Sequence, residues 1–266
     1  MTGMGPGMRL RLFLRSLFVQ SLWSFENMQG LGFGMCLEPW LGKVWKDAPA
    51  EGRRALARHC EHFNTNPYMT GLVLGMAASL EEAAAAAAGE ARPGLEGRQR
   101  TLKAAASSAL AALGDSFFWG AWRPFCAIFA VAAGVLGVIL GGRTVTVILA
   151  AAGFYVLAYA APVLALRWQG LSLGYRWGER FAQELSRYPF QRLIKATRMT
   201  GLCLALGCAG IAIFSIMSAS SLPRAGVVAA AVAGGWAARA YGLTARRLYA
   251  AVGAVGVLAA MAGLRW

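Results

Sequence analysis

Long uncharged runs dominate the second half of the chain. These runs are rich in Ala, Leu, Val, Ile and Gly, contain no Asp, Glu, Lys or Arg, and cover residues 125–141, 144–166, 199–222, 225–238 and 248–264. A helix needs about 20 apolar residues to cross a hydrocarbon core of about 30 Å. The pattern therefore predicts an all-α integral membrane protein with about five C-terminal transmembrane helices within 125–266. The fourth run is short and needs Arg239 to reach toward a headgroup.

The first 62 residues contain shorter apolar runs. Residues 16–25 and 27–37 are mostly apolar and are separated by Glu26, and neither run is long enough to span a bilayer. We expect amphipathic helices at the membrane interface here. The following segment turns polar, and its helical stretch 50–61 is predicted to be solvated, with a surface or interfacial role for His59 and His62.

Two polar segments interrupt the apolar pattern between residues 63 and 124. One is 63–69, Phe-Asn-Thr-Asn-Pro-Tyr-Met, in which Pro67 fits the first turn of a helix. The other is 114–120, Gly-Asp-Ser-Phe-Phe-Trp-Gly. Short helices with polar, broken starts are typical of re-entrant segments in transporters, so 63–124 is predicted to be a re-entrant region. The stretch 83–103 within it is expected to be a cytoplasmic linker.

Composition and charge agree with a membrane protein. The chain has 266 residues, of which 58% are hydrophobic and 14% charged, whereas a soluble domain is about a quarter charged. The formal net charge of +14 would suggest nucleic acid in a soluble protein. Here the basic residues separate uncharged runs, so we expect them to orient the chain in lipid, with no nucleic-acid partner. The Arg-rich loop 167–198 is predicted to be cytoplasmic and the turn 141–143 external.

The candidate chemistry is polar recognition rather than catalysis. The five cysteines include no C-x-x-C pair, and no nucleophile stands with an acid–base partner, so neither an enzymatic site, a metal nor a cofactor is expected. Asp115 is the only charged residue between Lys103 and Arg123, and a carboxylate at membrane depth costs a few kcal/mol. Asp115 is therefore a candidate ligand, although it could instead cap a helix. Trp119 could equally belong to an interfacial aromatic belt.

Four ordered motifs resemble the IID membrane component of the mannose-family sugar phosphotransferase system. They are Arg-Ser-Leu-Phe-Val-Gln at 15–20 with Trp-Ser-Phe-Glu-Asn-Met-Gln-Gly-Leu-Gly-Phe at 23–33, Arg-His-Cys-Glu-His-Phe-Asn-Thr-Asn-Pro-Tyr-Met at 58–69, the 114–120 segment with Arg-Pro at 123–124, and Arg-Trp at 167–168 with Gly170 and Gly-Tyr at 174–175. Ser24 and Asn27 stand where that family usually has Asn and Arg. The C-terminal third is similar in hydropathy alone.

The resemblance implies a subunit of a multi-pass sugar permease in the bacterial plasma (inner) membrane. Such a chain pairs with a IIC membrane subunit, and the pairs assemble into a larger hetero-oligomer, a trimer of pairs, surrounded by membrane lipid. The pair binds a mannose-like hexose from outside and presents it to cytoplasmic IIB, which IIA supplies with phosphoryl groups. The IID chain itself carries no phosphorylated residue.

By motif, the resemblance assigns the sugar contacts to six residues, namely Glu26, Gln29, Asn64, Asn66, Asp115 and Trp119. For the two asparagines, a role in a turn or a helix cap is the competing interpretation. A regulatory or sensory PTS membrane protein without net sugar transport is the alternative function. A pure assembly subunit, with all substrate contacts on IIC, is a further one.

Overall fold

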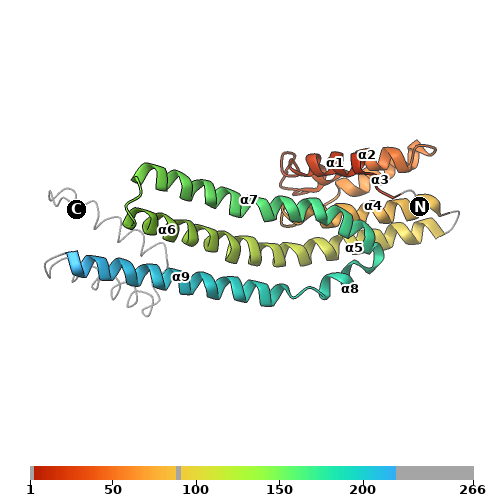
Figure 1. Cartoon of the computed structure of the whole chain (residues 1–266). Helices are drawn as coiled ribbons and strands as arrows, with labels where there is room; N and C mark the ends of the chain where they lie inside the picture. Colours follow the sequence, from red (N-terminus) through yellow and green to blue (C-terminus); the bar gives the residue numbers. More distant parts are fainter. Residues whose placement is uncertain (1–2, 88–90, 220–266) are drawn as a thin grey trace. The chain divides into compact units, whose positions relative to one another are not determined.

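The regular structure of the chain is helical throughout the part that the computed structural model describes, residues 3–87 and 91–219. The helices are α1 (Pro6–Ser16), α2 (Gly30–Val44), α3 (Pro49–Cys60), α4 (Thr70–Ala86), α5 (Ala91–Gly114), the π-helix η1 (Asp115–Trp122), α6 (Arg123–Ile139), α7 (Thr144–Trp177), the 3-10 turn η2 (Gly178–Arg180), α8 (Phe181–Ser186) and α9 (Phe190–Ala219) (Figure 1). The predicted all-α class is confirmed for these residues. The chain divides into the units Met1–Leu204 and Ala205–Trp266, and every contact described below lies in the first.

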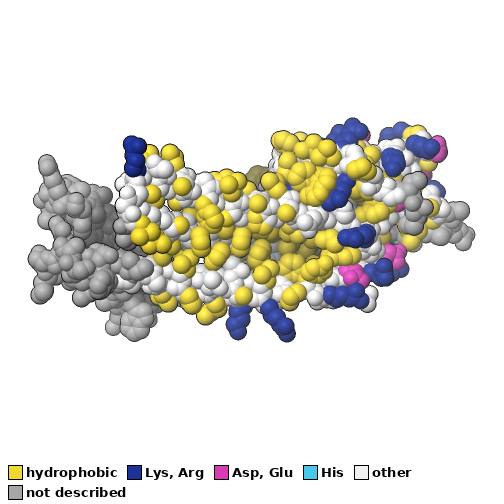
Figure 2. Space-filling view, viewed as in Figure 1, with side chains coloured by type: hydrophobic (Ala, Val, Ile, Leu, Met, Phe, Trp, Pro, Cys, Tyr) yellow, Lys and Arg dark blue, Asp and Glu magenta, His cyan; other side chains and the backbone are white. Residues whose placement is uncertain are grey.

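Two helical stretches are long and apolar enough to cross a membrane, by length and composition. They are Arg92–Val138, which runs through α5, η1 and α6, and Thr144–Ser186. Large apolar side chains are exposed along α6 and α7, among them Val131, Leu136, Val145, Ile148, Leu149 and Leu157. Figure 2 shows hydrophobic side chains covering this face. Such a patch is rare on a soluble monomer and suits contact with lipid. The predicted spans 225–238 and 248–264, with the end of 199–222, lie outside the described residues.

The predicted turn between the first two spans is present. Helix α6 ends where Gly141 adopts a positive φ of 85°, and the backbone N–H of Gly142 donates to the carbonyl of Gly137 at 3.0 Å. A left-handed residue after a helix satisfies its last carbonyls, and glycine adopts that conformation without a Cβ clash. The chain thus reverses direction between α6 and α7.

The tightest contact in this unit joins α4 to α7. A Cβ on Gly71 or Gly75 of α4 would overlap a carbonyl oxygen of α7, and a Cβ on Gly174 of α7 would overlap the carbonyl oxygen of Leu72. Glycines four residues apart on each helix therefore let the two backbones touch, as in small-xxx-small packing of membrane helices. Helix α4 is buried along nearly its whole length as a result.

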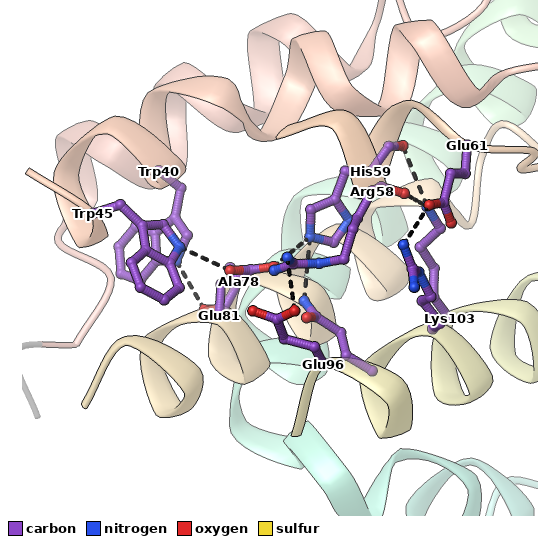
Figure 3. Close-up of polar contacts among 11 residues, drawn as sticks. Trp40, Trp45, Arg58, His59, Glu61, Ala78, Glu81, Glu96 and Lys103 are labelled. Carbon is purple, nitrogen blue, oxygen red and sulfur yellow. Dashed lines mark hydrogen bonds and ion pairs between the residues drawn. The ribbon is translucent and has the colours of Figure 1, made fainter. Parts of the chain in front are cut away.

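A buried ionic cluster closes the C-terminal end of α4 (Figure 3). The carboxylate of Glu81 is fully buried and accepts hydrogen bonds from Trp45 Nε1 at 2.8 Å and from Arg58 Nη2 at 3.2 Å. His59 Nε2 lies 2.9 Å from the same carboxylate. Arg58 also forms an ion pair with Glu96 of α5, with 3.1 Å between Nη1 and Oε2. The cluster therefore ties the end of α2 to α3, α4 and α5.

The charges in this cluster follow from burial and pairing. Burial lowers the pKa of His59, so the imidazole is neutral and donates one hydrogen bond. Burial alone would raise the pKa of Glu81, but hydrogen bonds from His59 and Trp45 and the charge of Arg58 outweigh it and hold that pKa at about 2. The expectation of a solvated helix with His59 at the surface is therefore wrong for Arg58 and His59, whereas His62 is exposed.

The N-terminal helices are displaced from their predicted positions. Helix α1 ends at Ser16 and α2 begins at Gly30, so most of 16–25 and the start of 27–37 form turns. The reason is tertiary pairing. The N–H of Gln29 donates to the carbonyl of Phe63 at 2.8 Å, which commits this backbone to a distant partner instead of a helix.

Helices also replace several predicted interruptions. Of the expected linker 83–103, only 87–90 lies between α4 and α5, since Ala, Glu, Arg and Lys favour helix. The expected break at 114–120 is a wider helical turn, η1, without interruption. Helix α7 extends past the apolar run to Trp177, so Arg167 and Arg176 belong to this helix and lie outside any loop.

The glycine contact predicts a specific sensitivity. Gly174→Ala places a methyl group against the carbonyl of Leu72 and should destabilise the detergent-solubilised chain by about 1–3 kcal/mol in thermal unfolding. Gly153→Ala is the matched control on the same helix, because nothing lies within 4 Å of that position. The control should be neutral or slightly stabilising, since Ala favours helix over Gly by about 1 kcal/mol. Equal stability of the two variants would contradict the contact.

The Glu81 cluster predicts a particular acid dependence. The pKa of Glu81 falls from 4.5 to about 2 on folding, so its stabilising contribution is complete above pH 4.5 and is lost as the pH falls toward 2. Glu81→Gln should remove this part of the acid dependence in thermal unfolding from about pH 7 to about pH 2. It should also cost about 3–5 kcal/mol at neutral pH, because Arg58 loses a buried partner. Glu38→Gln is the control, because the Glu38 carboxylate is half-exposed, and this variant should show the same dependence of thermal unfolding on pH as the wild type.

Candidate functional site

Three segments that are far apart in the sequence meet beside α7. The stretch 24–29 pairs with the loop before α4, since Phe63 N–H donates to the carbonyl of Asn27 at 3.3 Å and Gln29 N–H donates to Phe63. Asn66 Nδ2 then donates to Asp115 Oδ1 of η1 at 2.9 Å. The motif segments 23–33, 63–69 and 114–120 are thus brought together.

Asn66 organises the loop that precedes α4. Its side-chain Oδ1 accepts a hydrogen bond from the N–H of Tyr68 at 3.1 Å, and its carbonyl accepts one from Met69 at 2.9 Å. This is the local turn that a short amide side chain can mimic. Pro67 lies in this turn, before the helix begins at Thr70, so its predicted place in the first helical turn is wrong. The turn leaves the Asn66 Nδ2 group free to hold Asp115.

The π-helix η1 presents Asp115 and Trp119 toward the loop. A π-turn widens the helix and is frequent at functional sites. Here Arg198 of α9 supports it, since its guanidinium donates to the carbonyls of Gly120 at 3.1 Å and Ser116 at 3.3 Å. The rings of Tyr68 and Trp119 lie 5.5 Å apart between centroids.

A pocket of about 480 Å³ opens where these segments meet α7. Its polar and aromatic lining residues are Gln20, Gln29, Asn64, Thr65, Tyr68, Asp115, Trp119 and Arg167. Asn64, Asp115 and Trp119 are exposed, so these side chains are open to a ligand. The side chains of Leu17 and Val163 form an apolar part of the pocket wall.

The six sequence-predicted residues occupy different places. Gln29, Asn64, Asp115 and Trp119 line the pocket, and Asn66 contacts it through Asp115. The amide of Gln29 is occupied, because it donates to the carbonyl of Thr65 at 2.9 Å and accepts from the Thr65 N–H at 3.3 Å. Glu26 is the exception, since its side chain is exposed outside the pocket lining.

Four polar or aromatic pocket residues are absent from the sequence-predicted set, namely Gln20, Thr65, Tyr68 and Arg167, and Arg167 carries the only formal charge among these four. The sequence predicts that Arg167 lies in a loop, whereas it lies within α7 and is only 5% exposed. Its guanidinium donates to the carbonyl of Ser16 at 2.6 Å and to the carbonyl of Pro67, so it joins the end of α1 to the loop before α4. The available signal was its position as the first charge after a long apolar run, within the Arg-Trp motif.

The pocket offers the chemistry that hydroxyl-rich ligands require. A carboxylate accepts hydrogen bonds from hydroxyl groups, whereas an amide both donates and accepts. The indole of Trp119 supplies an apolar face with a defined orientation. The described residues include no group of three or more His, Cys, Asp and Glu side chains that could hold a metal ion.

Curated relatives are similar to this chain over 72% of its length. The mannose-specific EIID component of Escherichia coli is 30% identical over 191 residues, which is 72% of this chain and 62% of that protein. The fructose permease IID component of Bacillus subtilis is 30% identical over 192 residues, 72% of this chain and 64% of the relative. The matched part therefore spans less than two thirds of either relative's length.

A solved structure has a similar fold. A chain in the cryo-EM structure of the mannose transporter ManYZ in complex with a microcin superposes with a TM-score of 0.56 and 27% sequence identity, over 77% of this chain and 70% of that chain. The family model of the PTS system mannose/fructose/sorbose family IID component matches residues 7–213. With that match over most of its length, the chain belongs to the family of IID components of the mannose/fructose/sorbose phosphotransferase system.

Proposed function

We propose that the chain is a sugar-binding membrane subunit of a phosphotransferase permease that transports a hexose. The observation that carries this proposal is the convergence of three motif segments on one pocket, held by the Asn66–Asp115 hydrogen bond of 2.9 Å. These are the segments that resemble the IID family most closely. A pocket that serves only assembly would have no need of an exposed carboxylate beside an exposed indole.

In this proposal each side chain has a chemical role. Asp115 accepts hydrogen bonds from sugar hydroxyls, and Asn64 donates and accepts. Trp119 stacks on the apolar face of the pyranose ring. Asn66 and Gln29 position the pocket wall, because their amides already bind Asp115 and Thr65. Glu26 has no part in binding, since it lies outside the lining.

The proposed partners follow from the family. The chain pairs with a IIC subunit in the bacterial plasma membrane as a multi-pass protein, and the pairs form a trimer. Cytoplasmic IIB phosphorylates the hexose and is recharged by IIA. The exposed apolar surface of α6 and α7 supports burial against lipid or IIC.

Sugar uptake tests the proposal directly. Membranes that hold this chain with its IIC partner should accumulate sugar phosphate from labelled mannose or fructose when phosphorylated IIB is added, and should not accumulate it when either membrane subunit is omitted. If the two subunits assemble but no sugar accumulates, the chain is a regulatory or sensory protein instead.

Substitution of Asp115 tests the role of the pocket. Asp115→Asn keeps an oxygen that can accept the Asn66 hydrogen bond but removes the charge, so assembly should persist while uptake falls about 10- to 100-fold, since hydrogen bonds to charged groups contribute about 1.5–3 kcal/mol. Glu26→Gln is the matched control and should keep wild-type uptake. Uptake by Asp115→Asn at the wild-type rate would contradict the assignment.

A further inference from the structure

A second concave region lies between α1 and α7, on residues that the sugar pocket does not use. It has a volume of about 600 Å³ and is lined by Met4, Arg9, Gln169, Ser172, Leu173 and Arg176, among others. Two guanidinium groups therefore share one small space with a hydroxyl and an amide. Neither Arg9 nor Arg176 forms an ion pair with a carboxylate of the described residues.

Arg9 is held in place before any ligand binds. Its guanidinium stacks on the Trp168 ring, 4.0 Å from the centroid, and its Nη2 donates to the Trp168 carbonyl at 3.1 Å. Phe13 packs edge-on against the same indole, with 5.3 Å between ring centroids. The Nε–H of Arg9 is buried and has no hydrogen-bond partner among the described residues. The guanidinium of Arg9 is therefore fixed in orientation at the cavity, and a fixed guanidinium is well suited to bind the oxygens of an anion.

The two arginines are close enough to oppose each other. Burial and the positive charge of Arg176 both lower the pKa of Arg9. Like charges placed together cost free energy, and a bound anion relieves that cost. Tyr175 also lines this region, and its hydroxyl donates to the carboxylate of Glu82, which is not among the lining residues.

The position along α7 indicates where the anion would come from. The uncharged run 144–166 is about 35 Å long as a helix, which matches a hydrocarbon core of about 30 Å. Residues 168–176 follow directly and therefore fall at headgroup level, on the side that the Arg-rich segment marks as cytoplasmic. Exposed Leu10 and Leu14 continue along α1 beside Arg9, where acyl chains would lie.

We propose that Arg9 and Arg176, with Ser172 and Gln169, form a binding site for a phosphate group. Anionic phospholipid headgroups and soluble phosphate share this chemistry. The guanidinium groups bind the phosphate oxygens and the hydroxyl of Ser172 donates a further hydrogen bond. Anionic lipids are the favoured source, because basic pockets at the cytoplasmic ends of membrane helices bind such headgroups.

Lipid titration of the full chain tests the site. The unfolding midpoint of the chain in neutral detergent is measured with added dioleoylphosphatidylglycerol, dioleoylphosphatidylcholine or inorganic phosphate. Phosphatidylglycerol should raise the midpoint saturably, and phosphatidylcholine should not. Arg176→Gln should weaken the apparent affinity about five-fold, as expected for one basic residue near a membrane surface. Arg176→Gln removes the positive charge that opposes Arg9, so the midpoint without ligand should stay the same or rise slightly, and a weaker lipid response would not reflect an unfolded variant.

Arg11→Gln is the matched control, because Arg11 is exposed on α1 outside the pocket. Its unfolding midpoint should respond to phosphatidylglycerol with the same apparent affinity as that of the wild type. Arg9→Gln should weaken binding as Arg176→Gln does. If inorganic phosphate alone gives the saturable, Arg176-dependent shift, the site takes soluble phosphate. The proposal would be overturned if phosphatidylcholine raised the unfolding midpoint as much as phosphatidylglycerol does. It would also be overturned if Arg176→Gln bound phosphatidylglycerol with the wild-type apparent affinity.

Discussion

The contact between α4 and α7 is the constraint on which the rest of the described structure depends. Glycines on both helices let the backbones touch, so neither helix can rotate or slide without a steric clash. Helix α4 begins immediately after the loop that contains Asn66, and α7 supplies Arg167, which binds the carbonyl of Pro67 in the same loop. The backbone contact therefore fixes the start of α4, and Arg167 holds Pro67 just before it, whereas the pairing of Gln29 with Phe63 holds the other end of the loop. The loop forms one wall of the proposed sugar pocket, so these restraints define the shape of that pocket.

The two ends of α4 are held by different chemistry. At its C-terminal end the buried Glu81 cluster joins α2, α3 and α5 to α4 with charged hydrogen bonds (Figure 3). At its N-terminal end the Asn66–Asp115 hydrogen bond is partly buried and borders an open pocket. A fully buried, paired cluster resists change, whereas an exposed carboxylate can exchange water for ligand hydroxyls. This contrast fits a stabilising role for the first site and agrees with the sugar-binding role that we propose for the second.

The sequence was sufficient for the fold class and for the segments that converge, but not for where the helices begin and end. Apolar runs predict helices because the bilayer requires about 20 such residues, and the two longest described helical stretches agree. Helix α2 was misplaced because the Gln29 backbone pairs with Phe63, a contact that no local pattern reveals. The sequence places His59 in a polar helix with a surface or interfacial role and Arg167 in a cytoplasmic loop, because the burial of both depends on distant partners that no local pattern reveals. Glu26 matches the family motif but lies outside the pocket, which shows that motif membership does not place a side chain.

A structure of the assembled IIC–IID pair with bound hexose tests the central claim most directly. We predict sugar density in the pocket between η1 and the loop before α4, with hydroxyl oxygens within hydrogen-bond distance of the Asp115 carboxylate and the ring against Trp119. Helices α4 and α7 should keep their backbone contact in the same complex. A hexose held entirely by residues of the IIC subunit, with this pocket empty, would contradict the account.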